Sequence, residues 1–307
     1  YNAASAKSAY GSITSTISNG SVKYGTSITV TATAANGYVF AGWTDGTNTV
    51  STSSSYTFTM PAKNLNLTAT FSFNITAITN IRVLNVYPNA GNNLKSWMTT
   101  YGKGVINVSE VAIDTFNSDP GTYLGSTSGW NYDVVVFGFW DCNNSKDLST
   151  AAETLMDTYL SNGYGVIFGH DTVGRIGTGA CLYHPNFNLL AQKYANIDTN
   201  TSYTSNNGDQ VYINKSGIFT TYPYSIGTVG TTLTIPQAHN SGQIANGDIW
   251  LKFSNDVVAG NLNFYLTTYK MGAMIQTGHS SGAATTDEQK IIANLIFYMY
   301  SQIEMNR

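Results

Sequence analysis

The residues with the clearest capacity for chemistry are His170 and Asp171, which follow the apolar run 166–168 and a glycine. An imidazole beside a carboxylate can move protons, orient a nucleophile or help to hold a metal ion. A short apolar run that follows a helical pattern and precedes a Gly-rich loop predicts a buried strand of a parallel α/β sheet. Because ligands of such sheets bind beyond the carboxyl ends of the strands, the sequence predicts a site at His170 and Asp171.

Further reactive side chains are expected at the same edge of the sheet. If the protein is an enzyme, the candidate catalytic residues are His170, Asp171, Cys181 and His279. A Cys nucleophile needs a base within hydrogen-bond reach and a lowered pKa, and His184 or His279 could supply that base. The alternatives for Cys181 are a disulfide with Cys142 or an inert free thiol, since two cysteines are too few for a disulfide framework.

A binding role would use aromatic, amide and charged side chains near the strand ends. The candidate ligand-binding residues are Tyr87, Trp140, Asp141, Asn143, Arg175 and His184. A metal site is a further alternative, with candidate ligands Asp141, His170, Asp171, His184 and His279. Because no paired-ligand spacing accompanies these residues, we expect His170 and Asp171 to form a hydrogen-bonded pair that fastens the loop, with no metal and no cofactor.

The composition limits the possible partners. The chain has 307 residues, 42% of them hydrophobic, only 10% charged, with a net charge of -3 and 21 Tyr. The basic residues do not cluster, which argues against nucleic acid, and no apolar run approaches the roughly 20 residues that span a bilayer. A neutral, polar surface suits secreted and cell-surface proteins. Because Tyr1 is not an initiator Met, we expect a trimmed or mature fragment.

Residues 1–76 predict a small β domain. Period-two runs indicate strands at 27–32, 56–60 and 65–71. The segments Asn-Gly-Tyr-Val-Phe-Ala-Gly-Trp-Thr at 36–44 and Tyr-Thr-Phe-Thr-Met-Pro-Ala at 56–62, with 66–71, resemble the divergent internalin-B-type repeat, a β-grasp-like module. This resemblance implies a Gram-positive surface protein in which the module is a spacer or adhesion unit. Trp43 is expected to anchor the core, and an exposed sugar-stacking role is the alternative.

Residues 77–307 predict an α/β domain. Apolar strand patterns at 81–88, 132–141 and 263–279 alternate with helical patterns, of which 151–160 is one, and this rhythm predicts a parallel sheet. The polar segment at about 196–260 predicts an insertion with antiparallel β structure. Thr285 and Glu288 predict a capping box, in which each side chain satisfies a backbone N–H at the start of the last helix.

This domain resembles the class I glutamine-amidotransferase-like, or flavodoxin-like, superfamily, in an uncharacterised bacterial surface-protein branch. The resemblance rests on five segments: 83–88, 138–141, 167–171, 277–279 and 286–289. It implies a flavodoxin-like fold. True amidotransferases carry a Cys on a sharp turn after the central strand, where this chain has His170-Asp171, and this departure argues against glutamine hydrolysis.

Three classes of function follow from these observations. The leading hypothesis is a non-catalytic, extracellular surface protein, associated with the cell surface or cell wall, which binds a glycan or a host or cell-surface ligand. The alternative is a hydrolase that acts on a carbohydrate, ester or amide at the carboxyl edge of the sheet. The third is a structural spacer without a ligand.

Overall fold

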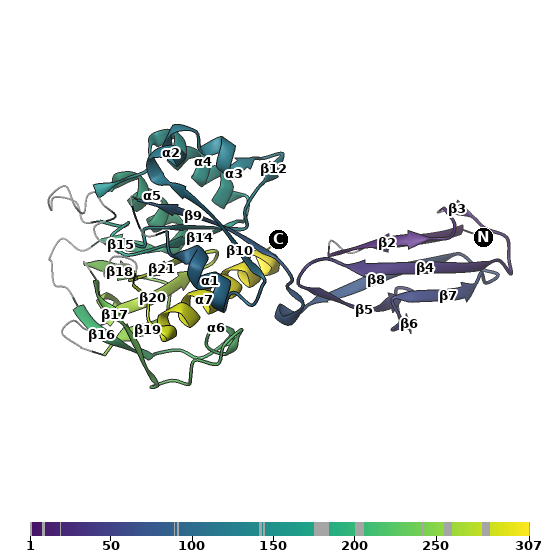
Figure 1. Ribbon diagram of the computed structural model, residues 1–307. Coiled ribbons are helices and arrows are strands. Elements are labelled where there is room, and N and C mark those ends of the chain that lie inside the picture. The colour runs from purple at the N-terminus through teal and green to yellow at the C-terminus, as the bar shows by residue number, and fades with distance from the viewer. Residues whose placement is uncertain are drawn as a thin grey trace. The chain divides into compact units, whose positions relative to one another are not determined.

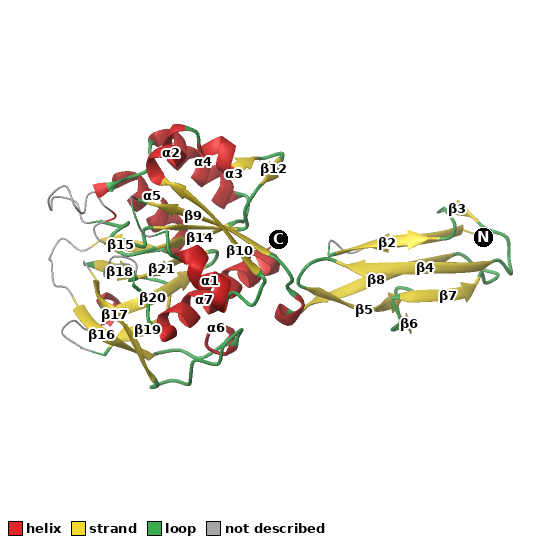
Figure 2. Ribbon diagram, viewed as in Figure 1, coloured by secondary structure: helices red, strands yellow, loops and turns green. Residues whose placement is uncertain are grey.

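The chain divides into two compact units, Tyr1–Thr79 and Asn80–Arg307. They are seen in a computed structural model that describes residues 2–7, 10–18, 20–88, 90, 92–140, 143, 145–174, 184–199, 206–240, 242–254, 260–277 and 283–306. Figure 1 traces the chain from the first unit to the second, and Figure 2 shows that the first unit consists of strands with one short helical turn, whereas the second contains strands and several helices.

Two β-sheets form the first unit. The five-stranded sheet has the order β3 (Gly20–Ser21), β1 (Asn2–Lys7), β8 (Leu65–Phe73), β5 (Tyr38–Thr44) and β6 (Thr49–Ser51). The three-stranded sheet has the order β2 (Gly11–Ser15), β4 (Ser27–Ala34) and β7 (Ser55–Thr59). Among the strands described in this unit, β1 and β8 alone pair in parallel. The described residues of this unit add one 3-10 turn, Ile75–Ala77, and no α-helix.

Alternation of side chains builds the core of this unit. Along β4 the side chains of Ile28, Val30 and Ala32 point inward and are buried, as the period of two in a strand requires. Trp43 is fully buried, and its indole N–H donates a hydrogen bond to the Ser54 carbonyl at 3.3 Å. The expected role of Trp43 as a core anchor is therefore confirmed, and its ring does not stack on a sugar.

The second unit is built on a nine-stranded sheet. Its order is β10 (Ile106–Ala112), β9 (Ile81–Tyr87), β13 (Val134–Phe137), β14 (Gly165–Phe168), β21 (Gly272–Ile275), β20 (Phe264–Tyr269), β19 (Asp248–Phe253), β16 (Asn206–Ile213) and β17 (Thr232–Asn240). The first five strands are parallel and the last four are antiparallel. The α/β class and the buried strand before His170 are confirmed.

Two short antiparallel pairs lie outside this sheet, β11 (Gly125–Ser126) with β12 (Gly129–Trp130) and β15 (Ile197–Thr199) with β18 (Gln243–Ala245).

Helices cover both faces of this sheet (Figure 1). One face carries α1 (Leu94–Tyr101), α6 (Ile218–Thr221) and α7 (Thr286–Asn306). The other carries α2 (Ile113–Ser118), α3 (Pro120–Leu124), α4 (Thr150–Ser161) and α5 (Pro185–Ala195). Every residue of β13 and β14 is buried because both faces are covered, which explains their continuous apolar sequence. None of the described helices is long and apolar enough to cross a membrane.

One prediction about strand direction was wrong. Residues 263–270 were expected to begin another parallel unit, but β20 pairs antiparallel with β21. The reason is the connection, since only Lys270 and Met271 lie between the two strands and a parallel crossover needs a dozen residues or more. The segment 196–260 contains antiparallel strands, as predicted, and three of them, β16, β17 and β19, extend the main sheet.

An ion pair secures the amino ends of the central strands. The buried Asp133 accepts hydrogen bonds from Arg82 Nη2 at 2.7 Å and from the Arg82 backbone N–H at 2.8 Å. We expect Asp133→Asn to lower the free energy of unfolding by about 2 kcal/mol, because it leaves the guanidinium with a neutral partner. Urea denaturation measures the change. The exposed pair Lys146–Asp114 provides the control, since Asp114→Asn should change stability by less than about 1 kcal/mol; equal effects would contradict the expectation.

Candidate functional site

The loop that follows β14 is held against its neighbouring strands by close backbone contacts. The Gly169 N–H donates to the Phe137 carbonyl at 2.7 Å, and the His170 N–H donates to the Thr277 carbonyl at 3.0 Å. A side chain at Gly169 would place Cβ 2.5 Å from the Gly138 carbonyl oxygen. Gly138 itself has φ = 75°, in the left-handed region that favours glycine. These glycines bring the carboxyl ends of β13, β14 and β21 together.

His170 and Asp171 lie in direct contact inside this loop. His170 Nε2 lies 2.9 Å from Asp171 Oδ2, and both side chains are buried. Asp171 has φ = 55°, an uncommon backbone conformation for a residue with a side chain. The sequence predicted that these two side chains would form a hydrogen bond, and the 2.9 Å contact at His170 Nε2 lacks the geometry of one. A third side chain also lies beside these two residues, which changes the interpretation of their contact.

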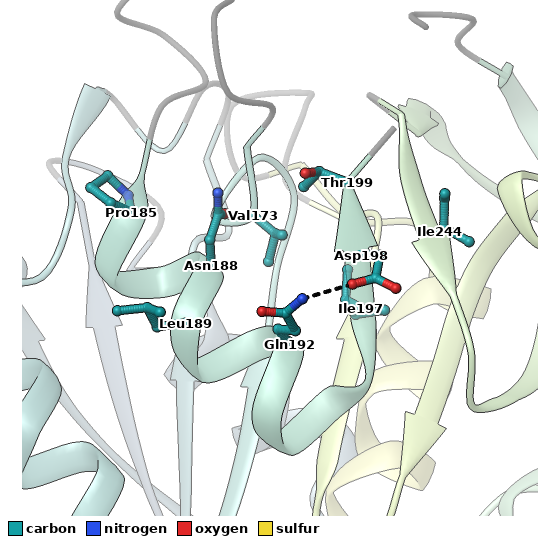
Figure 3. Close-up of a pocket in the computed structure, with 9 residues that line it drawn as sticks. All are labelled: Val173, Pro185, Asn188, Leu189, Gln192, Ile197, Asp198, Thr199 and Ile244. Atoms are coloured by element: carbon teal, nitrogen blue, oxygen red, sulfur yellow. Dashed lines mark hydrogen bonds between the residues drawn. The ribbon is translucent and has the colours of Figure 1, made fainter. Parts of the chain in front are cut away.

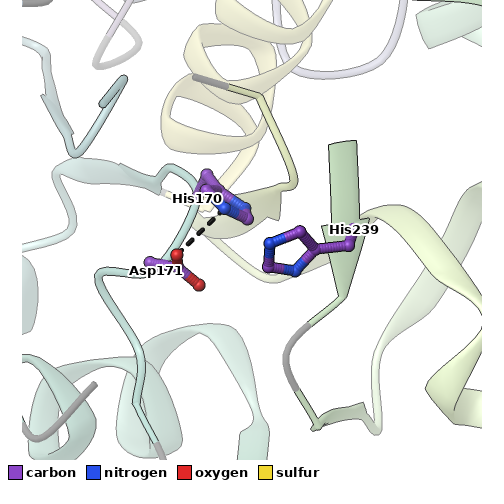
Figure 4. A group of neighbouring side chains, drawn as sticks. All are labelled: His170, Asp171 and His239. Carbon is purple, nitrogen blue, oxygen red and sulfur yellow. Dashed lines mark ion pairs between the residues drawn. The ribbon is translucent and has the colours of Figure 1, made fainter. Parts of the chain in front are cut away.

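That third side chain is His239, near the end of β17. Its ring centroid lies 4.5 Å from that of His170, with the two ring planes at 80°. One ligand atom from each of His170, Asp171 and His239 can be chosen so that all three lie within 4.8 Å of one another. Figure 4 shows the two imidazoles and the carboxylate turned toward a common point. We call these three residues the His-Asp-His cluster.

A tight turn positions His239. The Asn240 side chain accepts hydrogen bonds from the backbone N–H groups of Gly242 at 2.8 Å and Gln243 at 2.9 Å, which turns the chain from β17 into β18. The Gln243 side chain then donates to the Val173 carbonyl at 2.7 Å. Since Val173 belongs to the loop after β14, this bond fastens the turn to the segment that carries His170 and Asp171.

Sequence reasoning missed His239. It lies in the segment interpreted as an insertion, and nothing local to it indicates that this strand reaches the edge where β14 ends. The available signal was weak. The sequence has four histidines, and both His170 and His239 lie close to the carboxyl end of a strand, two residues after β14 and one residue before the end of β17.

His184 lies beside the cluster and has a supporting role. Its Nδ1 is 3.1 Å from the Thr172 carbonyl oxygen, so that this nitrogen carries the proton and donates it. Burial lowers the pKa of His184, although the charge of Asp147 opposes the shift. The neutral ring therefore braces the loop directly after Asp171. Its second nitrogen, Nε2, has no hydrogen-bond partner among the described residues.

Glu288 departs from the predicted capping box. The Thr285 hydroxyl does accept a hydrogen bond from the Glu288 N–H at 3.1 Å, so half of the motif forms. The Glu288 side chain is buried and accepts a hydrogen bond from the Tyr265 hydroxyl at 2.5 Å. Burial raises its pKa to about 7, and the hydroxyls of Thr277 and Tyr265 offset part of the rise. The Thr277 hydroxyl lowers the pKa of Glu288 because it lies nearby, since this hydroxyl and Glu288 Oε2 make no hydrogen bond of ordinary geometry.

The remaining predicted site residues divide into two groups. Tyr87 and Trp140 are half-buried at the ends of β9 and β13. Asn143 is buried and donates to the Lys146 carbonyl at 2.6 Å. Their role in ligand binding stays a prediction. Asp141, Cys142, Arg175, Cys181 and His279 lie outside the described residues, and so do the proposed Cys142–Cys181 bridge and the Cys-His pair.

A cavity of about 580 Å³ opens next to the cluster loop. Its lining residues come from that loop, α5, β15 and β18, and are Val173, Pro185, Asn188, Leu189, Gln192, Ile197, Asp198, Thr199 and Ile244. Figure 3 shows Gln192 and Asp198 reaching toward each other within it, joined by a 2.9 Å hydrogen bond. Asp198 also accepts a hydrogen bond from Asn246 at 3.0 Å. We call this the α5 cavity.

The topology of the second unit defines a mixed α/β protein, and sequence comparison identifies the first unit. Residues 1–75 match the Divergent InlB B-repeat domain family, a repeat typical of bacterial surface proteins. The sequence as a whole matches none of the curated proteins.

Three solved structures resemble the fold at low identity. PurLQS from Thermotoga maritima has 12% identity and a TM-score of 0.42, and the match covers 72% of this chain and 99% of that one. A protein described as a GMP synthase component from Thermoplasma acidophilum has 12% identity and a TM-score of 0.41, with 74% and 98% covered. Agd3, described as a carbohydrate deacetylase, has 14% identity and a TM-score of 0.43, with 71% and 32% covered.

Proposed function

We propose that this chain belongs to an extracellular bacterial protein at the cell surface or cell wall, and that its second unit binds a neutral glycan in the α5 cavity. The repeat in the first unit supports the location. The chemistry of the residues that line the cavity is the observation that supports a neutral glycan as the ligand. A volume of about 580 Å³ lies within the range of small-molecule sites and suits one or two sugar rings.

The lining favours an uncharged ligand with both polar and apolar faces. None of the described residues that line the cavity is basic, and the carboxylate of Asp198 already accepts two hydrogen bonds from amides. Val173, Leu189 and Ile244 supply apolar walls against which C–H groups of a sugar ring can pack. Gln192 and Thr199 supply a side-chain carbonyl and a hydroxyl for sugar hydroxyls. The charge-poor composition of the whole chain agrees with this choice.

Leu189 offers a clean test because its side chain is 57% exposed and contributes little to the core. We expect Leu189→Ala to weaken glycan binding about fivefold, which corresponds to about 1 kcal/mol of lost apolar contact. The measurement is isothermal titration calorimetry with the best ligand from a glycan array. Val229→Ala is the matched control, because Val229 is 61% exposed and does not line the cavity. An array without any binding glycan, or equal losses in both variants, would contradict the proposal.

The second candidate function is hydrolysis of a carbohydrate, ester or amide beside the same cavity. The His-Asp-His cluster favours it, since imidazole and carboxylate groups that converge at the carboxyl edge of a parallel sheet can activate water. Release of acetate or of a reducing sugar from the bound glycan distinguishes hydrolysis from binding alone.

A further inference from the structure

We propose that His170, Asp171 and His239 bind one divalent transition-metal ion, with Zn²⁺ as the expected occupant. This proposal does not rest on glycan binding, because it concerns the His-Asp-His cluster rather than the α5 cavity. The sequence led us to expect only a hydrogen-bonded pair, and the third residue changes that interpretation.

The three donors form a chemically coherent set. Two neutral imidazoles and one carboxylate are ligands of zinc and its neighbours in the first transition row, whereas Mg²⁺ and Ca²⁺ prefer oxygen ligands alone. Three protein ligands also leave a position open on a tetrahedral ion, which is the arrangement of catalytic rather than structural zinc sites.

The spacing of the donors is close to what an ion requires. Tetrahedral bonds of about 2.1 Å place ligand atoms roughly 3.4 Å apart. His170 Nε2 and Asp171 Oδ2 lie 2.9 Å apart, so they would separate by about 0.5 Å to reach this spacing. One ligand atom from each of the three residues lies within 4.8 Å of the others, so the longest separation would shorten by up to about 1.4 Å, chiefly through movement of His239. This residue is only half-buried and lies on an edge strand, so that its side chain has room to move.

Electrostatics also favour a cation at this point. His170 and Asp171 are buried, so water competes weakly for their lone pairs. The imidazole of His239 approaches that of His170 edge-on, with the ring centroids 4.5 Å apart. One divalent ion would accept a lone pair from all three groups at once. The Gln243–Val173 hydrogen bond holds the two contributing segments together and so acts as a support for the ligand set.

The test uses the whole tag-free protein after chelator treatment and dialysis. We expect titration with ZnCl₂ to give one tight site per chain, and MgCl₂ to give none. His239→Ala should weaken Zn²⁺ binding at least 100-fold, and so should His239→Gln, which keeps a polar side chain. Gln237→Ala is the matched control, because it lies two residues earlier on the same strand and is exposed; it should bind Zn²⁺ as the wild type does.

Two readouts keep the proposal open to refutation. Unfolding midpoints without metal should agree between wild type and both His239 variants, which excludes loss of binding through loss of folding. Co²⁺ substitution should give visible d–d bands without a thiolate charge-transfer band. Unchanged Zn²⁺ binding in the His239 variants, a thiolate band that assigns the ion to a cysteine, or no binding by the wild type would each overturn the proposal. Glycan binding is measured separately, so its failure leaves this result unaffected.

Discussion

Replacing Gly169 by alanine should lower the free energy of unfolding of the second unit by about 3 kcal/mol or more. The new Cβ would lie 2.5 Å from the carbonyl oxygen of Gly138 and 2.6 Å from that of Phe137. Both obstacles are backbone atoms, which cannot rotate away as a side chain can. Relief therefore requires β13 and β14 to separate at their carboxyl ends, and overpacking of this kind is strongly destabilising.

Urea denaturation followed by far-UV circular dichroism measures this effect. Gly129→Ala is the matched control, since Gly129 has no neighbouring atom within 4 Å of an added Cβ and no positive φ. That variant should stay within about 0.5 kcal/mol of the wild type, as surface substitutions usually do. Similar unfolding midpoints for the two variants would contradict this expectation, because they would show that the carboxyl ends of β13 and β14 can separate at little cost in free energy.

The second large effect is a pH dependence of the free energy of unfolding, which Glu288 causes. Its pKa is about 7 in the folded chain because the side chain is buried, whereas the ordinary value is 4.5. Between these two values the unfolded chain releases the proton and the folded chain keeps it. Folding therefore becomes less favourable as the pH rises from 4.5 to about 7, by about 3 kcal/mol in all. The stabilising contribution is complete below pH 4.5 and is lost as the pH rises through 7.

Glu288→Gln should abolish this part of the pH dependence. The amide resembles the protonated acid in shape and keeps an oxygen for the Tyr265 hydroxyl. We expect the variant to exceed the wild type in stability by about 3 kcal/mol at pH 8 and to match it at pH 4. The comparison at pH 4 is the internal control, because Glu288 is neutral there in both states. Parallel stability curves across the whole range would refute a raised pKa for this group.

Local patterns predicted the fold well where one local cause decides the outcome. The apolar stripe at 151–160 became α4, with Ser149 as the cap that accepts from the Ala152 N–H at 3.2 Å. The run before His170 became β14 because continuous apolar residues are typical of strands buried on both faces. Strand direction was less predictable. The sequence of residues 264–269 is compatible with a parallel or an antiparallel strand. The two-residue connection to the next strand was the only evidence against a parallel crossover.

The candidate site could be predicted only in part, for a similar reason. His170 and Asp171 follow a buried strand, so their place at the edge of the sheet follows from the strand itself. His239 belongs to the site because of the turn held by Asn240 and Gln243, which is a tertiary contact without a periodic signal. Glu288 was misjudged because its motif describes the helix terminus and not what the side chain meets, which is the buried Tyr265.

The bond between Gln243 and Val173 also has a consequence for the order in which the protein assembles. It joins two segments that lie 70 residues apart in the sequence, and β21, which pairs with β14, follows the antiparallel strands in the chain. Because contacts of such long sequence separation slow folding, we expect the two imidazoles to meet late in folding. A reagent that reports the paired histidines would then follow these late, non-local contacts.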